Sequence, residues 1–91
     1  MLDRIVGVKA KEEFRLEVEF ADGVRGVVDM GALVGRGVFA PLAEPAYFAR
    51  VAIDDFGVLC WPNGADLAPD AMHDALASCG VWRPGAEPLA A

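Results

Sequence analysis

The sequence contains few of the residues on which enzyme chemistry usually depends. It has one histidine, His73, and two cysteines among 91 residues. A single histidine limits acid–base and metal chemistry, and two cysteines are too few for the disulfide framework of a small secreted protein. Because Cys60 and Cys79 have apolar neighbours, we expect two reduced, buried thiols in a cytoplasmic protein. A single disulfide between them is the alternative.

Basic residues are also scarce. Eight Lys and Arg stand against fourteen Asp and Glu, which gives a formal net charge of −6. Binding to nucleic-acid phosphates or to an anionic membrane needs a basic face, so we expect no direct nucleic-acid partner and no membrane partner. No apolar run approaches the roughly 18–20 residues that span a bilayer, and the first residues do not resemble a signal peptide.

The length of the chain predicts a single domain. Area scaling indicates that a chain of this size buries roughly 63% of its unfolded surface, enough for one modest core. Apolar residues make up 55% of the sequence, which argues against disorder. We expect one α+β domain over residues 1–82 and a flexible tail over residues 83–91, where two prolines and a glycine occur.

Alternation of apolar and charged residues predicts a β-hairpin in the first half. Residues 14–20 alternate with period two, and residues 5–10 form a preceding strand whose register the sequence leaves open. A three-residue loop ending at Gly23 pairs Glu19 with Arg25 on the polar face, and it places Phe20 opposite Val24 and Leu16 opposite Val28 on the apolar face. We therefore expect Gly23 to adopt a left-handed conformation at the end of a type I turn.

A second hairpin is predicted later in the chain. If Gly57 closes its turn as Gly23 closes the first, Ile53 lies opposite Leu59 and Val51 lies opposite Trp61.

A helix is predicted over residues 69–79, where apolar residues recur at helical spacing and Gly80 provides a stop. Residues 30–50 contain several glycines and prolines and predict only short helical turns near residues 31–34 and 45–49. The fold class is therefore α+β, with a mostly antiparallel sheet built from hairpins and one C-terminal helix packed on one face.

One segment matches the glycine pattern of a dinucleotide-binding loop. Residues 35–40 read Gly-Arg-Gly-Val-Phe-Ala, but Pro41 and Pro45 prevent the long helix that would meet a pyrophosphate. We therefore expect a surface loop here and no cofactor.

The remaining polar residues suggest an interaction surface and lack the spacing of a catalytic or metal site. We expect no catalytic residue and no metal. Acidic residues gather on one strand face and around the start of the helix, and such surfaces attract basic partners. Two tryptophans could anchor a partner or pack in the core. The candidate interaction surface comprises Trp61, Asn63, Asp66, Asp70, His73, Glu13, Glu17, Glu19 and Trp82.

Several motifs together resemble a known family. They are Phe20-Ala21-Asp22-Gly23, Asp29, Phe39-Ala40-Pro41-Leu42, Pro45, Phe48, Val51, Asp54, Gly57 and Trp61-Pro62-Asn63-Gly64-Ala65-Asp66-Leu67. From about Ile5 to about Met72 the sequence resembles the small bacterial proteins of domain of unknown function 2442. The resemblance implies an α+β domain with no established activity and no catalytic residues to carry over. Some relatives are encoded beside small toxin-like partners, which implies an antitoxin-like or regulatory role.

Two functional hypotheses follow. The leading hypothesis is a non-enzymatic protein-interaction domain, antitoxin-like or regulatory, with a basic partner encoded nearby. The alternative is a small-molecule or metal-binding enzyme that uses Asp66, Asp70 and His73. A homodimer is also expected, because a short sheet has edges that a symmetric dimer would cover.

Overall fold

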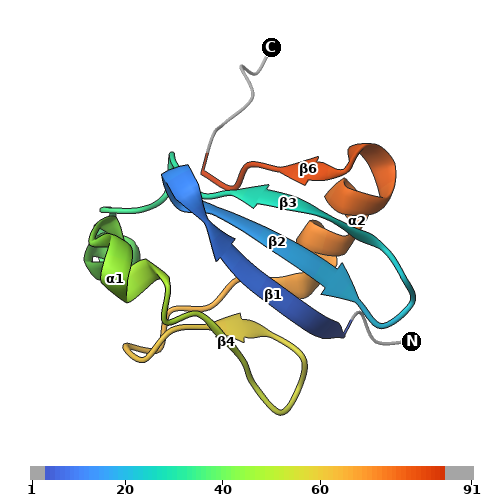
Figure 1. The fold of residues 1–91 in the computed structure, drawn as a ribbon, viewed down its shortest axis with the longest axis horizontal. Coiled ribbons are helices and arrows are strands. Elements are labelled where there is room, and N and C mark those ends of the chain that lie inside the picture. Colours follow the sequence, from blue (N-terminus) through green and yellow to red (C-terminus); the bar gives the residue numbers. More distant parts are fainter. Residues whose placement is uncertain (1–3, 86–91) are drawn as a thin grey trace.

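Four strands form the larger sheet, in the order β1 (Ile5–Lys11), β2 (Arg15–Phe20), β3 (Arg25–Asp29) and β6 (Val81–Trp82) (Figure 1). The first three are antiparallel neighbours, whereas β6 runs parallel to β3. The computed structural model describes residues 4–85. A smaller antiparallel sheet pairs β4 (Ala52–Ile53) with β5 (Leu59–Cys60). The predicted α+β class, with a mostly antiparallel sheet, is confirmed.

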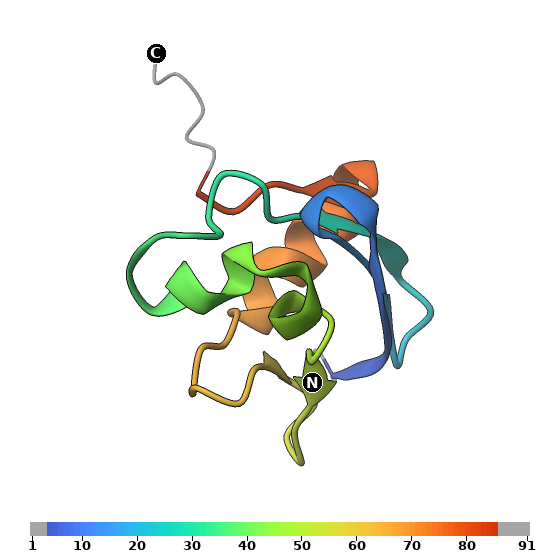
Figure 2. The same cartoon turned by 60° about the vertical axis from the view of Figure 1, so that its left-hand side comes forward.

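Helical segments lie on one side of the larger sheet. They are η2 (Gly37–Ala43, a 3₁₀ helix), α1 (Pro45–Phe48) and α2 (Pro69–Cys79). Figure 2 shows these segments and the smaller sheet on the same side, so within the described residues the other face of the larger sheet is uncovered.

The first hairpin has the predicted register. Glu19 pairs with Arg25, and Gly23 has a φ of 95°, the left-handed conformation expected of it. The Gly23 N–H donates to the Phe20 carbonyl at 3.0 Å. The sequence left the register of the first strand undetermined, and in the structure Val8 of β1 pairs with Val18 of β2. A β-bulge lies between Ile5 and Gly7.

The second hairpin is one pair shorter than predicted. Ile53 pairs with Leu59 as expected, and the ladder ends at the next pair, Ala52 with Cys60. The Trp61 N–H donates instead to the Ala65 carbonyl at 2.9 Å. Trp61 therefore belongs to the following turn and not to the ladder.

The helix over Pro69–Cys79 is confirmed, and Gly80 ends it with a φ of 82°. The Gly80 N–H donates to the Leu76 carbonyl at 2.9 Å. Met72 and Leu76 are buried. They join a core that contains Ile5, Leu16, Val18, Phe20, Val28, Met30, Leu42, Phe48, Leu59, Trp61, Ala65 and Leu67.

The prediction of two buried thiols is wrong, although both cysteines are free. Cys79 is exposed and Cys60 is half-buried. Cys79 occupies the last turn of α2, where Gly80 already directs the chain toward β6, so Leu76 is the last fully covered residue of the apolar stripe. At Cys60, burial raises the pKa of the thiol, and the charges of Asp54 and Asp66 raise it further. This thiol is therefore a poor nucleophile.

Besides η1 (Glu12–Phe14), a 3₁₀ helix in the turn between β1 and β2, two elements were absent from the sequence prediction. Strand β6 follows α2 and places Trp82 beside Val28. The Trp82 side chain is half-buried and packs against the core. The other element is η2, which lies where a surface loop was expected. Of the predicted tail, residues 86–91 lie outside the described residues.

Candidate functional site

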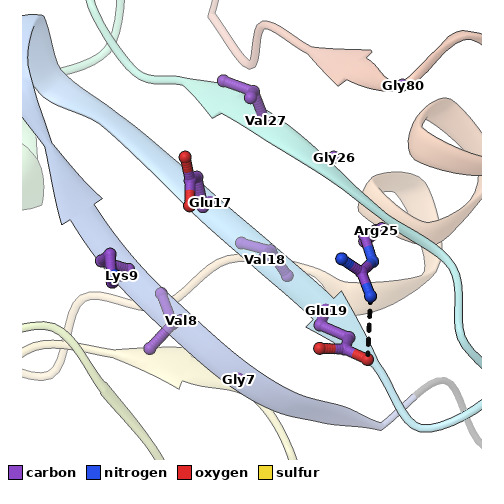
Figure 3. Close-up of a pocket in the computed structure, with 10 residues that line it drawn as sticks. All are labelled: Gly7, Val8, Lys9, Glu17, Val18, Glu19, Arg25, Gly26, Val27 and Gly80. Atoms are coloured by element: carbon purple, nitrogen blue, oxygen red, sulfur yellow. Dashed lines mark ion pairs between the residues drawn. The ribbon is translucent and has the colours of Figure 1, made fainter.

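The outer face of the larger sheet carries both signs of charge. Arg25 Nη2 lies 4.0 Å from Glu19 Oε2, and Lys11 Nζ lies 3.6 Å from Glu17 Oε2. Lys9 is the cross-strand neighbour of Glu17. Of these side chains, Lys9, Glu17, Glu19 and Arg25 line a shallow hollow of about 610 Å³ (Figure 3). The expectation of an acidic strand face is therefore corrected, because strand pairing places basic side chains among the glutamates.

Glu13 has a role in the turn between β1 and β2. Its φ is 60°, and the next residue, Phe14, has the same value. Its carboxylate Oε1 lies 3.3 Å from Arg15 Nη2. Like Glu17 and Glu19, Glu13 thus has a basic partner on the same chain.

The Trp-Pro-Asn-Gly motif holds the loop before α2 in place. Trp61 is only 3% exposed, and its indole Nε1–H donates to the Phe48 carbonyl at 3.0 Å. Asn63 Nδ2 donates to the Val38 carbonyl at 2.8 Å, and its Oδ1 accepts from the Ala65 N–H at 3.1 Å. These bonds connect the loop to α1 and η2. Trp61 is therefore a core residue and is removed from the candidate surface.

His73 faces the first hairpin. Its Nε2 lies 2.7 Å from Asp22 Oδ2, and its ring meets the Phe20 ring edge-on at a centroid distance of 4.9 Å. The pKa of the Asp22 carboxyl is lowered, first by the hydrogen bond from the Val24 N–H and then by His73. His73 thus connects α2 to the turn of the hairpin.

The structure does not assemble a metal site from the residues of the alternative hypothesis. Among residues 4–85, no three His, Cys, Asp or Glu side chains are grouped so that they could hold a metal ion. Asp66 and Asp70 are exposed, and His73 contacts Asp22.

Net negative charge is concentrated in one stretch of the chain. Residues 51–82 contain five aspartates and no Lys or Arg, whereas the rest of the sequence contains nine acidic and eight basic residues. All five aspartates are exposed. They lie on the second hairpin, the loop after it and α2, and they are Asp54, Asp55, Asp66, Asp70 and Asp74. These five exposed aspartates therefore account for most of the net negative charge of the protein.

Phe56, at the turn between β4 and β5, was missed by the sequence analysis. It is 78% exposed, the highest value among the large apolar residues that the structure describes as exposed. Its position in the sequence could have identified it. Phe56 lies in the turn between the two predicted strands, so it is not one of the inward-facing residues of either strand.

A family model described as "Protein of unknown function (DUF2442)" matches residues 5–76. The chain belongs to this family. The matched region of this DUF2442 protein runs from the start of β1 into α2 and includes the Trp61–Asn63 loop and the Phe56 turn. No curated protein and no solved structure matches the chain. No helix within residues 4–85 has the length and apolar character needed to cross a membrane.

Proposed function

We propose that this DUF2442 protein is a non-enzymatic interaction domain that binds a basic protein partner, in an antitoxin-like or regulatory role. The observation that carries the proposal is the exposed aspartate surface of residues 51–82, which contains no Lys or Arg. Within residues 4–85, none of these five aspartates forms an ion pair with a Lys or Arg side chain, in contrast to Glu17 and Glu19, and the nearby Arg4 donates to the backbone carbonyl of Asp55.

Electrostatics explains why such a surface favours a basic partner. A surface of one charge sign steers an oppositely charged protein during encounter and raises the association rate. At physiological ionic strength the screening length is about 8 Å, so neighbouring exposed carboxylates act together on an approaching cation. The affinity of the complex should therefore fall as salt is added.

The partner is proposed to meet this domain in the cytoplasm and to be encoded nearby. Cys60 and Cys79 are free in the structure, and free thiols are typical of reducing compartments.

The expected homodimer is not required for this function. The open edge strand β1 carries a bulge and two lysines, Lys9 and Lys11, which oppose edge-to-edge pairing. Light scattering measures the oligomeric state directly.

The enzyme hypothesis receives no comparable support from residues 4–85. His73 is hydrogen-bonded to Asp22, and Asp66, Asp70 and His73 do not form a ligand group.

The test is affinity capture from the organism that encodes the chain, with two charge-matched variants. In the first variant all five aspartates of residues 51–82 become asparagine. In the second, five glutamates elsewhere, Glu12, Glu13, Glu17, Glu19 and Glu44, become glutamine. Both variants change the net charge from −6 to −1. A basic protein captured by the wild type and the glutamine variant, but not by the asparagine variant, supports the proposal. Equal loss from both variants, or no captured protein, contradicts it.

A further inference from the structure

Phe56 is placed where an apolar side chain contributes little to the fold. Its side chain is 78% exposed, compared with 56% for Val6 and 51% for Val38. The turn that carries it projects from the lower end of the molecule in both Figure 1 and Figure 2. Covering an exposed phenyl ring with another molecule removes apolar area from water, which favours association.

The turn is held rigidly around Phe56 by Asp54. Asp54 Oδ1 accepts from the Phe56 N–H at 2.8 Å and from the Val58 N–H at 3.0 Å. The Gly57 N–H donates to the Asp54 carbonyl at 3.0 Å. These bonds involve the backbone of Phe56, so the turn itself does not need an aromatic side chain at this position.

The start of β1 fixes the same turn from the other side. The Ile5 N–H donates to the Gly57 carbonyl at 3.0 Å, and Arg4 Nη1 donates to the Asp55 carbonyl at 3.2 Å. Gly57 is buried with a φ of 78°, and a Cβ there would lie 2.7 Å from Arg4 Cγ. Phe56 is thus presented on a backbone that is already ordered, which reduces the entropy lost on binding.

We infer that Phe56 is the apolar anchor of the acidic interaction surface, and that it inserts into an apolar pocket rimmed by Lys or Arg on the partner protein. This inference rests on the proposed function. Two carboxylates, Asp54 and Asp55, directly precede Phe56, and the backbone of Asp66 forms an isolated β-bridge with Cys60 of β5. An aromatic side chain within a polar rim is the usual composition of an interaction hot spot. The carboxylates of this rim select cations on the partner.

Two experiments test the anchor. The first replaces Phe56 by the photoreactive analogue p-benzoylphenylalanine and irradiates cells that express the variant; the same analogue at Val38 is the control. We expect a covalent adduct with a partner protein from position 56 and none from position 38. We also expect the cross-linked segment to contain Lys or Arg beside apolar residues.

The second experiment measures affinity for the purified partner. Phe56→Ser should weaken binding about 30-fold, the effect of a typical hot-spot side chain. Val38→Ser should change it less than threefold. Thermal unfolding of both variants checks that they fold as the wild type does.

The outcomes separate the anchor from the proposed function. If Phe56→Ser binds like the wild type while the asparagine variant does not bind, the inference that Phe56 is an anchor is wrong. The proposal that the five aspartates bind a basic partner is then still supported. If the adduct joins two copies of the chain, Phe56 contacts a second copy and the anchor for a basic partner is wrong. If no partner depends on the five aspartates, the proposed function fails and the anchor fails with it.

Discussion

His73 of α2 and Asp22 of the first hairpin turn are joined by a 2.7 Å contact between Nε2 and Oδ2. The imidazole ring also stands edge-on to Phe20, whose side chain is buried. The His73 side chain is only 17% exposed. This pair therefore connects the helix to the tip of a hairpin that lies far from it in sequence.

Asp22→Asn is expected to change how stability depends on pH. The pKa of Asp22 is lowered in the folded state, first by the Val24 N–H and then by His73. A carboxyl with a lowered pKa stabilises the fold above its ordinary pKa and loses that contribution as the pH falls through the folded-state value. Asn keeps an oxygen that can accept from the Val24 N–H but does not ionise.

The free energy of unfolding, measured with urea at a series of pH values, should favour the wild type near neutrality. The advantage over Asp22→Asn should shrink between about pH 5 and pH 3. Asp74→Asn, at an exposed position of α2 beside His73, is the control. A wild-type advantage that stays constant across this range would contradict the prediction.

Glu13→Gly is expected to stabilise the protein. Glu13 and Phe14 both have a φ of 60°, and the Phe14 ring packs edge-on to Phe48 at 5.3 Å. A left-handed conformation costs an L-residue roughly 1–2 kcal/mol, whereas glycine adopts it freely. The exposed ion pair to Arg15 that the change removes is worth about 0–1 kcal/mol.

We therefore expect the free energy of unfolding to rise by about 0.5–1 kcal/mol in Glu13→Gly. Glu12→Gly, one residue earlier and without a positive φ, should lower it. Chemical denaturation of the two variants beside the wild type provides the comparison, and a lower stability for Glu13→Gly would show that the turn is not strained.

The first hairpin was predictable because local pattern and register agree. Period-two alternation over residues 14–20 has one hairpin register that places Leu16, Val18, Phe20 and Val28 on the same buried face, and the structure adopts it. Strand β6 was not predictable in this way, because Val81–Trp82 is too short to show a period and its parallel partner β3 lies far away in sequence. Cys79 belongs to the apolar stripe of α2, and the helical spacing of that stripe does not show which of its residues the sheet covers. The exposure of Cys79 could therefore not be predicted.

Of the candidate site, only the distribution of charge along the chain could be predicted from the sequence. The absence of Lys and Arg from residues 51–82 can be read from the sequence. The pairing of Glu17 with Lys11 depends on the register between β1 and β2, which the sequence left open. The contact of His73 with Asp22 depends on how α2 packs against the hairpin, which no local pattern specifies.

Gly26→Ala is expected to be strongly destabilising, because β3 and the end of α2 approach closely at this residue. A Cβ on Gly26 would lie 2.3 Å from the Gly80 carbonyl oxygen and 2.9 Å from Leu76 Cδ2. Backbone atoms cannot move aside as a flexible side chain can, so α2 would have to shift. Overpacking of this kind costs about 1–3 kcal/mol, or occasionally more.

Gly7→Ala is the matched control in the same sheet. A Cβ on Gly7 would lie 3.7 Å from Glu19 Cβ, which is an ordinary contact, so the change should be neutral or slightly stabilising. Thermal unfolding followed by circular dichroism distinguishes the two variants. Equal melting temperatures for Gly26→Ala and Gly7→Ala would mean that α2 does not pack closely on β3.

Asn63→Asp separates a structural role of the Trp-Pro-Asn-Gly motif from a role in recognition. The aspartate keeps an oxygen for the Ala65 N–H but loses the amide that donates to the Val38 carbonyl, and it places a carboxylate oxygen near that carbonyl. Loss of this hydrogen bond should lower the free energy of unfolding by about 1 kcal/mol. At a temperature where the variant is fully folded, its affinity for the basic partner should stay within threefold of the wild type. A large loss of affinity without a loss of stability would place Asn63 on the recognition surface instead.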